Sequence, residues 1–115
     1  MVMQYLFLMY VDRGLTPLSD AADRYGELRH ATAAAGVHVA MGRLERDGES
    51  VVLRREGPDT SVTSVPIASN RFAPVGFCLL DCADREEALA WASRIPAAEY
   101  GSVEVRSIEP GQAEP

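Results

Sequence analysis

Two segments of this sequence carry large apolar side chains on both alternating sets of positions of a strand. They are Met3 to Tyr10 ("MQYLFLMY") and Val75 to Asp81 ("VGFCLLD"). Successive side chains of a strand point to opposite faces of its sheet. Each segment therefore predicts a strand with apolar side chains on both faces, which needs a cover on both sides of the sheet.

Between these segments the spacing of apolar residues changes to that of a helix. Residues 17–35 place apolar side chains three and four positions apart, from Leu18 through Tyr25 to Ala35. Thr16-Pro17 is typical of a helix start, and Gly36 of a helix end. We expect an amphipathic helix of about five turns here. Residues 37–44 ("VHVAMGRL") alternate and predict a second strand.

The rest of the chain predicts further strands and a second helix. Asp84 and Glu87 form a capping-box pattern before a helix that Pro96 ends. A turn at "RDGES" and a loop at "ASNRFAP" separate the other elements. The expected strands are residues 51–56, a further short strand at 60–66, residues 75–81 and residues 102–108.

This order, β-α-β-β-(β)-β-α-β, is the ferredoxin-like βαββαβ pattern of an α+β fold with a mostly antiparallel sheet. Two helices cover only one face of such a sheet. The second apolar set, which includes Leu6, Leu8 and Leu79, would leave a large apolar patch in water. We therefore expect a homodimer in which a second copy packs sheet against sheet.

The last strand indicates what lies between the two sheets. If Val103 and Val105 face the helices, Glu104 and Arg106 face the space between the copies or its rim. His38 falls on the same side by alternation, beside the small residues Ala40 and Gly42. We therefore expect an inter-sheet pocket. Its candidate lining residues are His38, Arg43, Glu104, Tyr10 and Asp12.

Each candidate has a chemical and a structural interpretation. His38 is a candidate general base, or a histidine packed in its strand. Tyr10 and Asp12 are a candidate acid–base pair, or a strand end followed by a turn. Arg71 is a candidate clamp for a carboxylate or phenolate, or a solvated loop arginine. Glu104 either contacts a ligand or pairs with Arg106 across the dimer interface.

Composition excludes several classes of function. The formal net charge is −6 and no basic stripe is present, so we expect no nucleic-acid partner. Cys78 and Cys82 fit reduced thiols of a cytoplasmic protein and suggest no metal site. The apolar start is too short for a membrane span. Nucleotide-binding, P-loop and common hydrolase motifs are missing, so we expect no cofactor. Residues 1–109 are expected to form one domain, and residues 110–115 a disordered tail.

Several stretches together resemble a known family. "QYLFLMY", "AAAGV" before "HVAMGRL", and "ADREEALAWASRIPAAEYGSVEVRSIEP" look like the YCII-related family, in its DGPF branch. The resemblance runs from about Met3 to Ile108 and is most specific in the C-terminal part. It implies a dimeric α/β barrel. The family's activity is mostly uncharacterised, so the resemblance names no substrate.

The sequence departs from the family pattern where chemistry is expected. The branch's Asp-Gly-Pro-Phe stretch corresponds to residues 64–67, Ser64-Val65-Pro66-Ile67, in which only the proline is retained. The family's histidine corresponds to a position near Tyr25 and not to His30. Asp12 lies within a residue of the family's aspartate. The resemblance therefore supplies no catalytic pair.

Two functional hypotheses follow from these observations. The first is a cofactor-free homodimer that binds a small, largely apolar organic molecule and transfers protons, in isomerisation, elimination or cyclisation. His38 or the Tyr10/Asp12 pair would supply acid or base, while Arg43, Arg71, Tyr100 and Glu104 would bind the ligand. The second is a non-catalytic binding or accessory dimer, supported by Ser64 at the position of the branch's aspartate.

Overall fold

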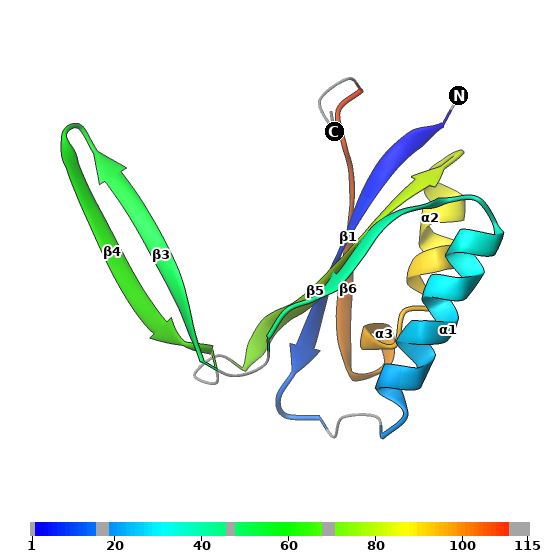
Figure 1. Ribbon diagram of the computed structural model, residues 1–115, viewed down its shortest axis with the longest axis horizontal. Helices are drawn as coiled ribbons and strands as arrows, with labels where there is room; N and C mark the ends of the chain where they lie inside the picture. Colours follow the sequence, from blue (N-terminus) through cyan, green and yellow to red (C-terminus); the bar gives the residue numbers. More distant parts are fainter. Residues whose placement is uncertain (1, 16–18, 46–47, 68–70, 111–115) are drawn as a thin grey trace.

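A four-stranded antiparallel sheet organises the molecule, with the strand order β2-β5-β1-β6. The computed structural model describes residues 2–15, 19–45, 48–67 and 71–110. The sheet consists of β1 (Met3–Asp12), β2 (His38–Arg43), β5 (Phe72–Cys82) and β6 (Gly101–Ser107). Helices α1 (Ala21–Ala34), α2 (Arg85–Ala92) and α3 (Ala97–Tyr100) lie on one face of it (Figure 1). This α+β architecture is consistent with the predicted ferredoxin-like fold.

The core lies between the sheet and the helices. Tyr5, Phe7 and Met9 of β1 alternate inward, and Cys78 and Leu80 do so on β5. The alternate set remains on the other face of the sheet, without a helix over it (Figure 1). That set contains Leu6, Leu8, Phe77 and Leu79, and we call this side of the sheet the open face. The predicted division of both strands into two apolar faces is confirmed.

Helix α1 packs on the sheet through Tyr25, Leu28 and Thr32, which lie three to four residues apart and so share one side of the helix. Gly36 ends the helix in a left-handed conformation with φ 74°, as its sequence predicts. The expected start at Thr16-Pro17 lies outside the described residues. The helix begins at Ala21 and has 14 residues, about four turns instead of five.

Helix α2 begins with a modified capping box. The Asp84 carboxylate accepts a hydrogen bond from the Glu87 amide at 2.8 Å, as predicted. The Glu87 carboxylate, however, accepts from the Ala83 amide at 3.0 Å and not from Asp84. Two amides at the helix start are therefore still paired. Together with α3, the helix buries Ala88, Ile95 and other small side chains against the sheet.

Strands β3 (Glu49–Glu56) and β4 (Asp59–Pro66) form a separate two-stranded sheet. Gly57-Pro58 joins them, and Gly57 has φ 57°, as the first position of a tight hairpin turn requires. The hairpin projects on the side of the main sheet opposite the helices (Figure 1). Both strands were expected. The predicted loop at residues 68–74 is partly wrong, because β5 already begins at Phe72; residues 68–70 lie outside the described ranges.

A bulge in β2 reverses the predicted orientation of His38. The pairing of β2 with β5 shifts between His38 and Ala40, so that His38 lies opposite Leu80 while Ala40 lies opposite Leu79. One extra residue in a strand moves the preceding side chains to the other face. His38 therefore faces the helices with Leu80, and the expectation that it faces the second copy is wrong. Strand β6 alternates as expected: Val103 and Val105 face the helices, and Glu104 faces the other side of the sheet.

Candidate functional site

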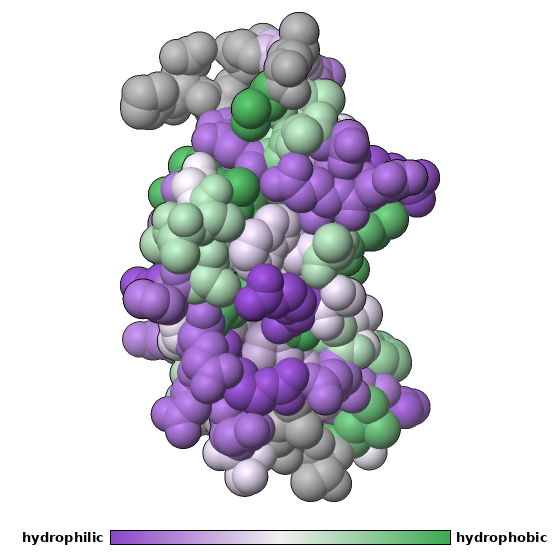
Figure 2. Space-filling view, turned by 90° about the vertical axis from the view of Figure 1, so that its right-hand side faces the viewer, coloured by the Kyte–Doolittle hydropathy of each residue, from purple (hydrophilic) through white to green (hydrophobic). Residues whose placement is uncertain are grey.

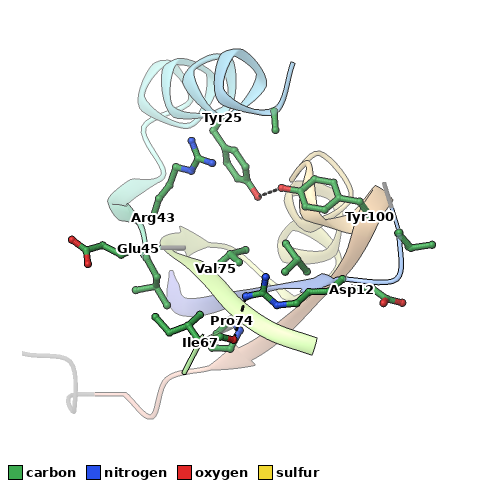
Figure 3. Close-up of a pocket in the computed structure, with 13 residues that line it drawn as sticks. Asp12, Tyr25, Arg43, Glu45, Ile67, Pro74, Val75 and Tyr100 are labelled. Carbon is green, nitrogen blue, oxygen red and sulfur yellow. Dashed lines mark hydrogen bonds between the residues drawn. The ribbon is translucent and has the colours of Figure 1, made fainter. Parts of the chain in front are cut away.

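The most developed pocket lies at one end of the sheet, on its helix side and not on the open face. It has a volume of about 210 Å³ and opens between α1, α3 and the ends of β1 and β2 (Figure 3). The described lining residues are Val11, Asp12, Arg13, Leu15, Ala21, Tyr25, Arg43, Leu44, Glu45, Ile67, Pro74, Val75 and Tyr100. The inter-sheet pocket expected from the sequence would require a second copy and stays a prediction.

Two phenols form the polar wall of this pocket. Tyr25 from α1 and Tyr100 from the end of α3 place their hydroxyl oxygens 3.3 Å apart, and each residue is 7% exposed. Burial, followed by this hydrogen bond, raises the pKa of Tyr25 above its usual value. The Tyr25 phenol therefore keeps its proton at neutral pH and acts as a hydrogen-bond donor.

Two guanidinium groups stand beside the phenols. Arg43 of β2 lies over the Tyr25 ring, 5.2 Å from its centroid, a cation–π geometry. Arg13, just after β1, donates to the Ile67 carbonyl oxygen at 3.3 Å. This contact joins the end of β1 to the base of the β3–β4 hairpin. The pocket wall consequently includes two guanidinium groups, from the exposed residues Arg13 and Arg43, in a protein whose net charge is −6.

The carboxylates of the lining residues point away from the cavity. Figure 3 shows the side-chain oxygens of Asp12 and Glu45 directed outward. Asp12 accepts from the Arg71 guanidinium at 3.0 Å and from the Gly14 amide at 2.8 Å. These bonds lower the pKa of Asp12, the Arg71 bond most. Asp12 is therefore ionised at neutral pH and is a poor proton acceptor.

Arg71, the predicted clamp for a ligand, forms contacts with other residues of its own chain. Besides Asp12, its guanidinium lies 5.2 Å from the centroid of the Phe72 ring. Its side chain is 67% exposed. Arg71 therefore pairs with a carboxylate of its own chain, that of Asp12. Whether it also contacts a ligand stays a prediction.

Tyr10 and Glu104 lie on the open face, as expected, and form their own pair. The Tyr10 hydroxyl donates to the Glu104 carboxylate at 3.2 Å. Burial first, then this hydrogen bond and the nearby negative charge, raises the pKa of Tyr10. Their strands β1 and β6 are neighbours in the sheet. Tyr10 and Glu104 lie on the opposite side of the sheet from the Tyr25 phenol. Whether Tyr10 and Asp12 act together stays a prediction.

His38 occupies a third location, against α1. Its Nδ1 lies 3.1 Å from the hydroxyl of the fully buried Thr32. That hydroxyl already donates its single proton to the Arg29 carbonyl oxygen at 3.1 Å. The Nδ1–H of His38 is therefore the donor, and the ring is a fixed structural contact on the helix side. It does not line the pocket described above.

The room expected beside His38 on the open face is also occupied. A β-carbon built on Gly42 would lie 2.6 Å from an edge carbon of the Phe77 ring. The ring therefore covers the glycine, its cross-strand partner, as aromatic side chains often do in sheets. The small residues of β2 accommodate a side chain of the same chain and not a ligand.

Comparison with known proteins identifies the family. The model of the YCII-related domain matches residues 3–111. The chain belongs to the YCII-related family. A relative from Rhizobium meliloti (strain 1021), the uncharacterized protein R00369, is 30% identical over 121 residues, covering 96% of this chain and 98% of the relative. The resemblance noted in the sequence is thereby confirmed at the level of the family, and the assignment to the DGPF branch stays a prediction.

In this YCII-related chain the pocket contains both positions at which the family resemblance expects chemistry. The resemblance expects the family's histidine near Tyr25 and its aspartate within a residue of Asp12, and both correspondences stay predictions. Tyr25 and Asp12 both line one cavity. Sequence reasoning assigned Tyr25 to the core of its helix and did not select Arg13 at all. The sequence feature that could have selected Tyr25 as a site residue is its phenol on the inward side of a helix, near the start of that helix.

Among the described residues no group of three or more His, Cys, Asp or Glu side chains is placed to hold a metal ion. The longest described helix has 14 residues, and none of the helices has the length and apolar character that crossing a membrane requires. The predicted tail falls almost entirely on residues 111–115, which are outside the described ranges.

Proposed function

We propose that this YCII-related protein is a homodimer that binds a small organic acid in the pocket formed by Tyr25, Tyr100, Arg13 and Arg43. The observation that carries the proposal is the direction of the charged groups. Proton donors and guanidinium groups line the cavity, whereas the Asp12 and Glu45 carboxylates point outward (Figure 3). Such an arrangement favours an anion because its charge is met by several donors at once.

The size and walls of the pocket narrow the ligand class. Its volume of about 210 Å³ corresponds to about seven water molecules at about 30 Å³ each. Val11, Leu44, Ile67 and Val75 provide apolar walls opposite the polar groups. A monocarboxylate or phenolate with a small hydrocarbon or aromatic body fits this combination better than a nucleotide or a polymer.

If the protein is an enzyme, Tyr25 is the proton donor that we propose. A neutral phenol with a raised pKa donates a hydrogen bond to negative charge that develops on a substrate oxygen, as in an enolisation, elimination or cyclisation. Tyr25 supplies only the acid in this proposal, because His38, the base candidate from the sequence, is bonded to Thr32 outside the pocket; a base on the substrate or from solvent would accept the abstracted proton. No cofactor is part of the proposed step.

A specific observation favours the non-catalytic alternative. Asp12, the carboxylate next to Arg13 in the sequence, accepts hydrogen bonds from the Arg71 guanidinium and the Gly14 amide. Among the described lining residues no imidazole is present to accept a proton near neutral pH. A protein that only binds and releases the acid needs no such group. If the protein turns over a bound ligand and Tyr25→Phe abolishes this turnover, the protein is an enzyme and not only a binding protein.

The homodimer in this proposal rests on the open face. Its residues lie in two rows across the sheet, each ending in a charged residue on β6: Ala40, Leu79, Leu6 and Arg106, then Gly42, Phe77, Leu8 and Glu104. By contrast, the outer face of the helices is largely hydrophilic (Figure 2). A second copy is the cover that we propose for the open face, with Glu104 and Arg106 at the edge of the contact.

Calorimetric titration of the purified protein with benzoate, salicylate and the neutral analogue benzamide tests the ligand class. We expect the acids to bind and the amide to bind at least ten-fold more weakly, since each charge-assisted hydrogen bond contributes about 1.5–3 kcal/mol. Arg43→Gln should weaken acid binding by a similar factor, whereas Arg106→Gln on the opposite face should not. Equal binding of acid and amide, or no effect of Arg43→Gln, would contradict the proposal.

A further inference from the structure

Among the described elements, the β3–β4 hairpin makes few contacts with the rest of its own chain. Nearly every residue of both strands is exposed, Val65 being the exception. Among the described elements, β3 and β4 pack extensively only against each other. A lone two-stranded hairpin is marginally stable in water. An element of this kind therefore needs a surface to pack against.

One side of the hairpin is suited to such packing. Cross-strand partners lie on the same side of a hairpin, and the register pairs Leu53 with Val62 and Val51 with Ser64. Leu53 and Val51 are each 63% exposed, and Val62 is 61% exposed. We call Val51, Leu53 and Val62 the arm face. The other side alternates Val52 with Arg54 and is more polar.

We propose that the hairpin is an arm whose arm face packs on the open face of a second copy. The arm face of the second copy packs in the same way on the open face of the first. This inference rests on the homodimer proposed above and specifies the contact within it. The hairpin points away from the main sheet of its own chain (Figure 1), whereas a two-fold axis lets both arms dock at once. One chain thus supplies both an apolar strand pair and an uncovered apolar sheet.

The areas suffice for a dimer interface. An open face of four strands about 4.8 Å apart and about seven residues long covers about 440 Å². The eight-residue arm measures about 27 Å by about 10 Å, or about 270 Å². The arm covers about 270 Å² of the second copy's open face, so each copy contributes about 540 Å² and the dimer buries about 1,080 Å², above the roughly 1,000 Å² expected of a biological interface.

Charges at the two surfaces are complementary. Arg55 follows Leu53 on the same side of the hairpin, towards its tip. The open face has Glu104 at its β6 edge and Asp81 near the end of β5. Arg106 lies beside Glu104 on the same strand. The Arg55 guanidinium is therefore favoured near Asp81 and disfavoured at the β6 edge, and this sets the direction in which the arm docks.

Docking of the arm also reaches the pocket. Ile67 follows β4 directly, lines the cavity and accepts the hydrogen bond from Arg13. An arm held by a second copy therefore fixes one wall of the ligand site. The proposed dimer thus supports the site without placing a partner side chain in it.

Cysteine cross-linking between chains tests the arm contact directly. Native Cys78 and Cys82 do not interfere, because both are buried and burial raises their thiol pKa values to about 12 and about 11. One population carries Leu6→Cys and the other Val62→Cys; the control replaces Val62→Cys with Thr63→Cys, on the other side of the hairpin. After mixing and mild oxidation we expect a covalent dimer only with Val62→Cys. Equal cross-linking of both pairs, or of neither, would overturn the arm face.

Association constants provide an independent test by sedimentation. Leu53→Asp should raise the dimer dissociation constant at least ten-fold, and Val52→Asp on the other side less than three-fold. Circular dichroism verifies that each variant is folded. A wild-type protein that stays monomeric at 100 µM would reject the homodimer itself. A dimer that Leu8→Glu dissociates but Leu53→Asp does not would reject only the arm.

Discussion

Gly101 begins β6 where the strand passes close to β1. A β-carbon built on Gly101 would lie 1.9 Å from the Tyr10 carbonyl oxygen, closer than any non-bonded contact tolerates. The obstacle is backbone and not a flexible side chain. Only glycine allows β6 to reach its position next to β1 directly after α3, which places Tyr100 in the pocket.

Gly101→Ala should therefore lower the free energy of unfolding by about 2 kcal/mol or more, within the range of overpacking substitutions. Gly26→Ala is the matched control, because its β-carbon would meet nothing within 4 Å inside a helix. There alanine should stabilise the protein by up to about 1 kcal/mol. Urea unfolding measures both. Equal effects of the two substitutions would contradict the close approach at Gly101.

Tyr25→Phe should cost about 1 kcal/mol at pH 8, because it removes the hydrogen bond with Tyr100. It should also change the dependence of stability on alkaline pH. The folded state raises the pKa of Tyr25 above its usual value of 10.0. The folded chain therefore holds the proton longer, and the free energy of unfolding falls as the pH rises above about 10.

Urea unfolding of both proteins between pH 8 and 11 measures this slope. The variant should lose less stability than the wild type over the range, so that the two curves converge. The raised thiol pKa values of Cys78 and Cys82 also lower stability above about pH 9, but they are common to both proteins. Parallel curves would show that Tyr25 is not the group responsible.

At the scale of elements, the strand β2 shows how one residue alters a site. Alternation read along "VHVAMG" places His38 opposite to where the bulge at Val39 puts it. Arg43 follows the bulge and lies on the same side as Met41, so plain alternation places it on the helix side, next to Tyr25. A periodic pattern in the sequence contains no sign of the extra residue, because the bulge depends on how β2 pairs with β5.

The start of α2 was predictable because its cause is local. Asp84→Ala removes the hydrogen bond to the Glu87 amide and should lower the free energy of unfolding by about 1 kcal/mol. Glu86→Ala, in the same exposed turn, should change it by less than about 0.5 kcal/mol. Thermal unfolding compares the two. A larger effect at Glu86 would mean that charge, and not the cap, matters at this helix start.

At the scale of the whole molecule, the radius of gyration is 16.0 Å, whereas about 13 Å is typical of a compact chain of this length. The projecting hairpin accounts for the difference. A shape of this kind, with an apolar arm and an apolar sheet face, agrees with the proposed assembly of two copies.

Leu8→Glu on the open face should therefore raise the dimer dissociation constant at least ten-fold, because a charge would be buried at the centre of the contact. Leu89→Glu is the control, since Leu89 is 45% exposed on α2 and lies on the helix side. Light scattering after gel filtration at several concentrations measures both. Unchanged association of the Leu8→Glu protein would mean that the open face is not the dimer contact.

The sequence alone determined the element order, the two helices' inward sides and the division of β1 and β5 into two apolar faces. These follow from periodicity and from caps that act within a few residues. The family also followed from the sequence, through "EALAWA" and "GSVEVR".

Only the tertiary structure decided where the pocket lies. It brings Tyr25 next to Tyr100 from 75 residues away, turns His38 towards the helices through a bulge and occupies Asp12 with Arg71. Contacts of this kind depend on strand register and on the approach of distant segments, which no local pattern encodes.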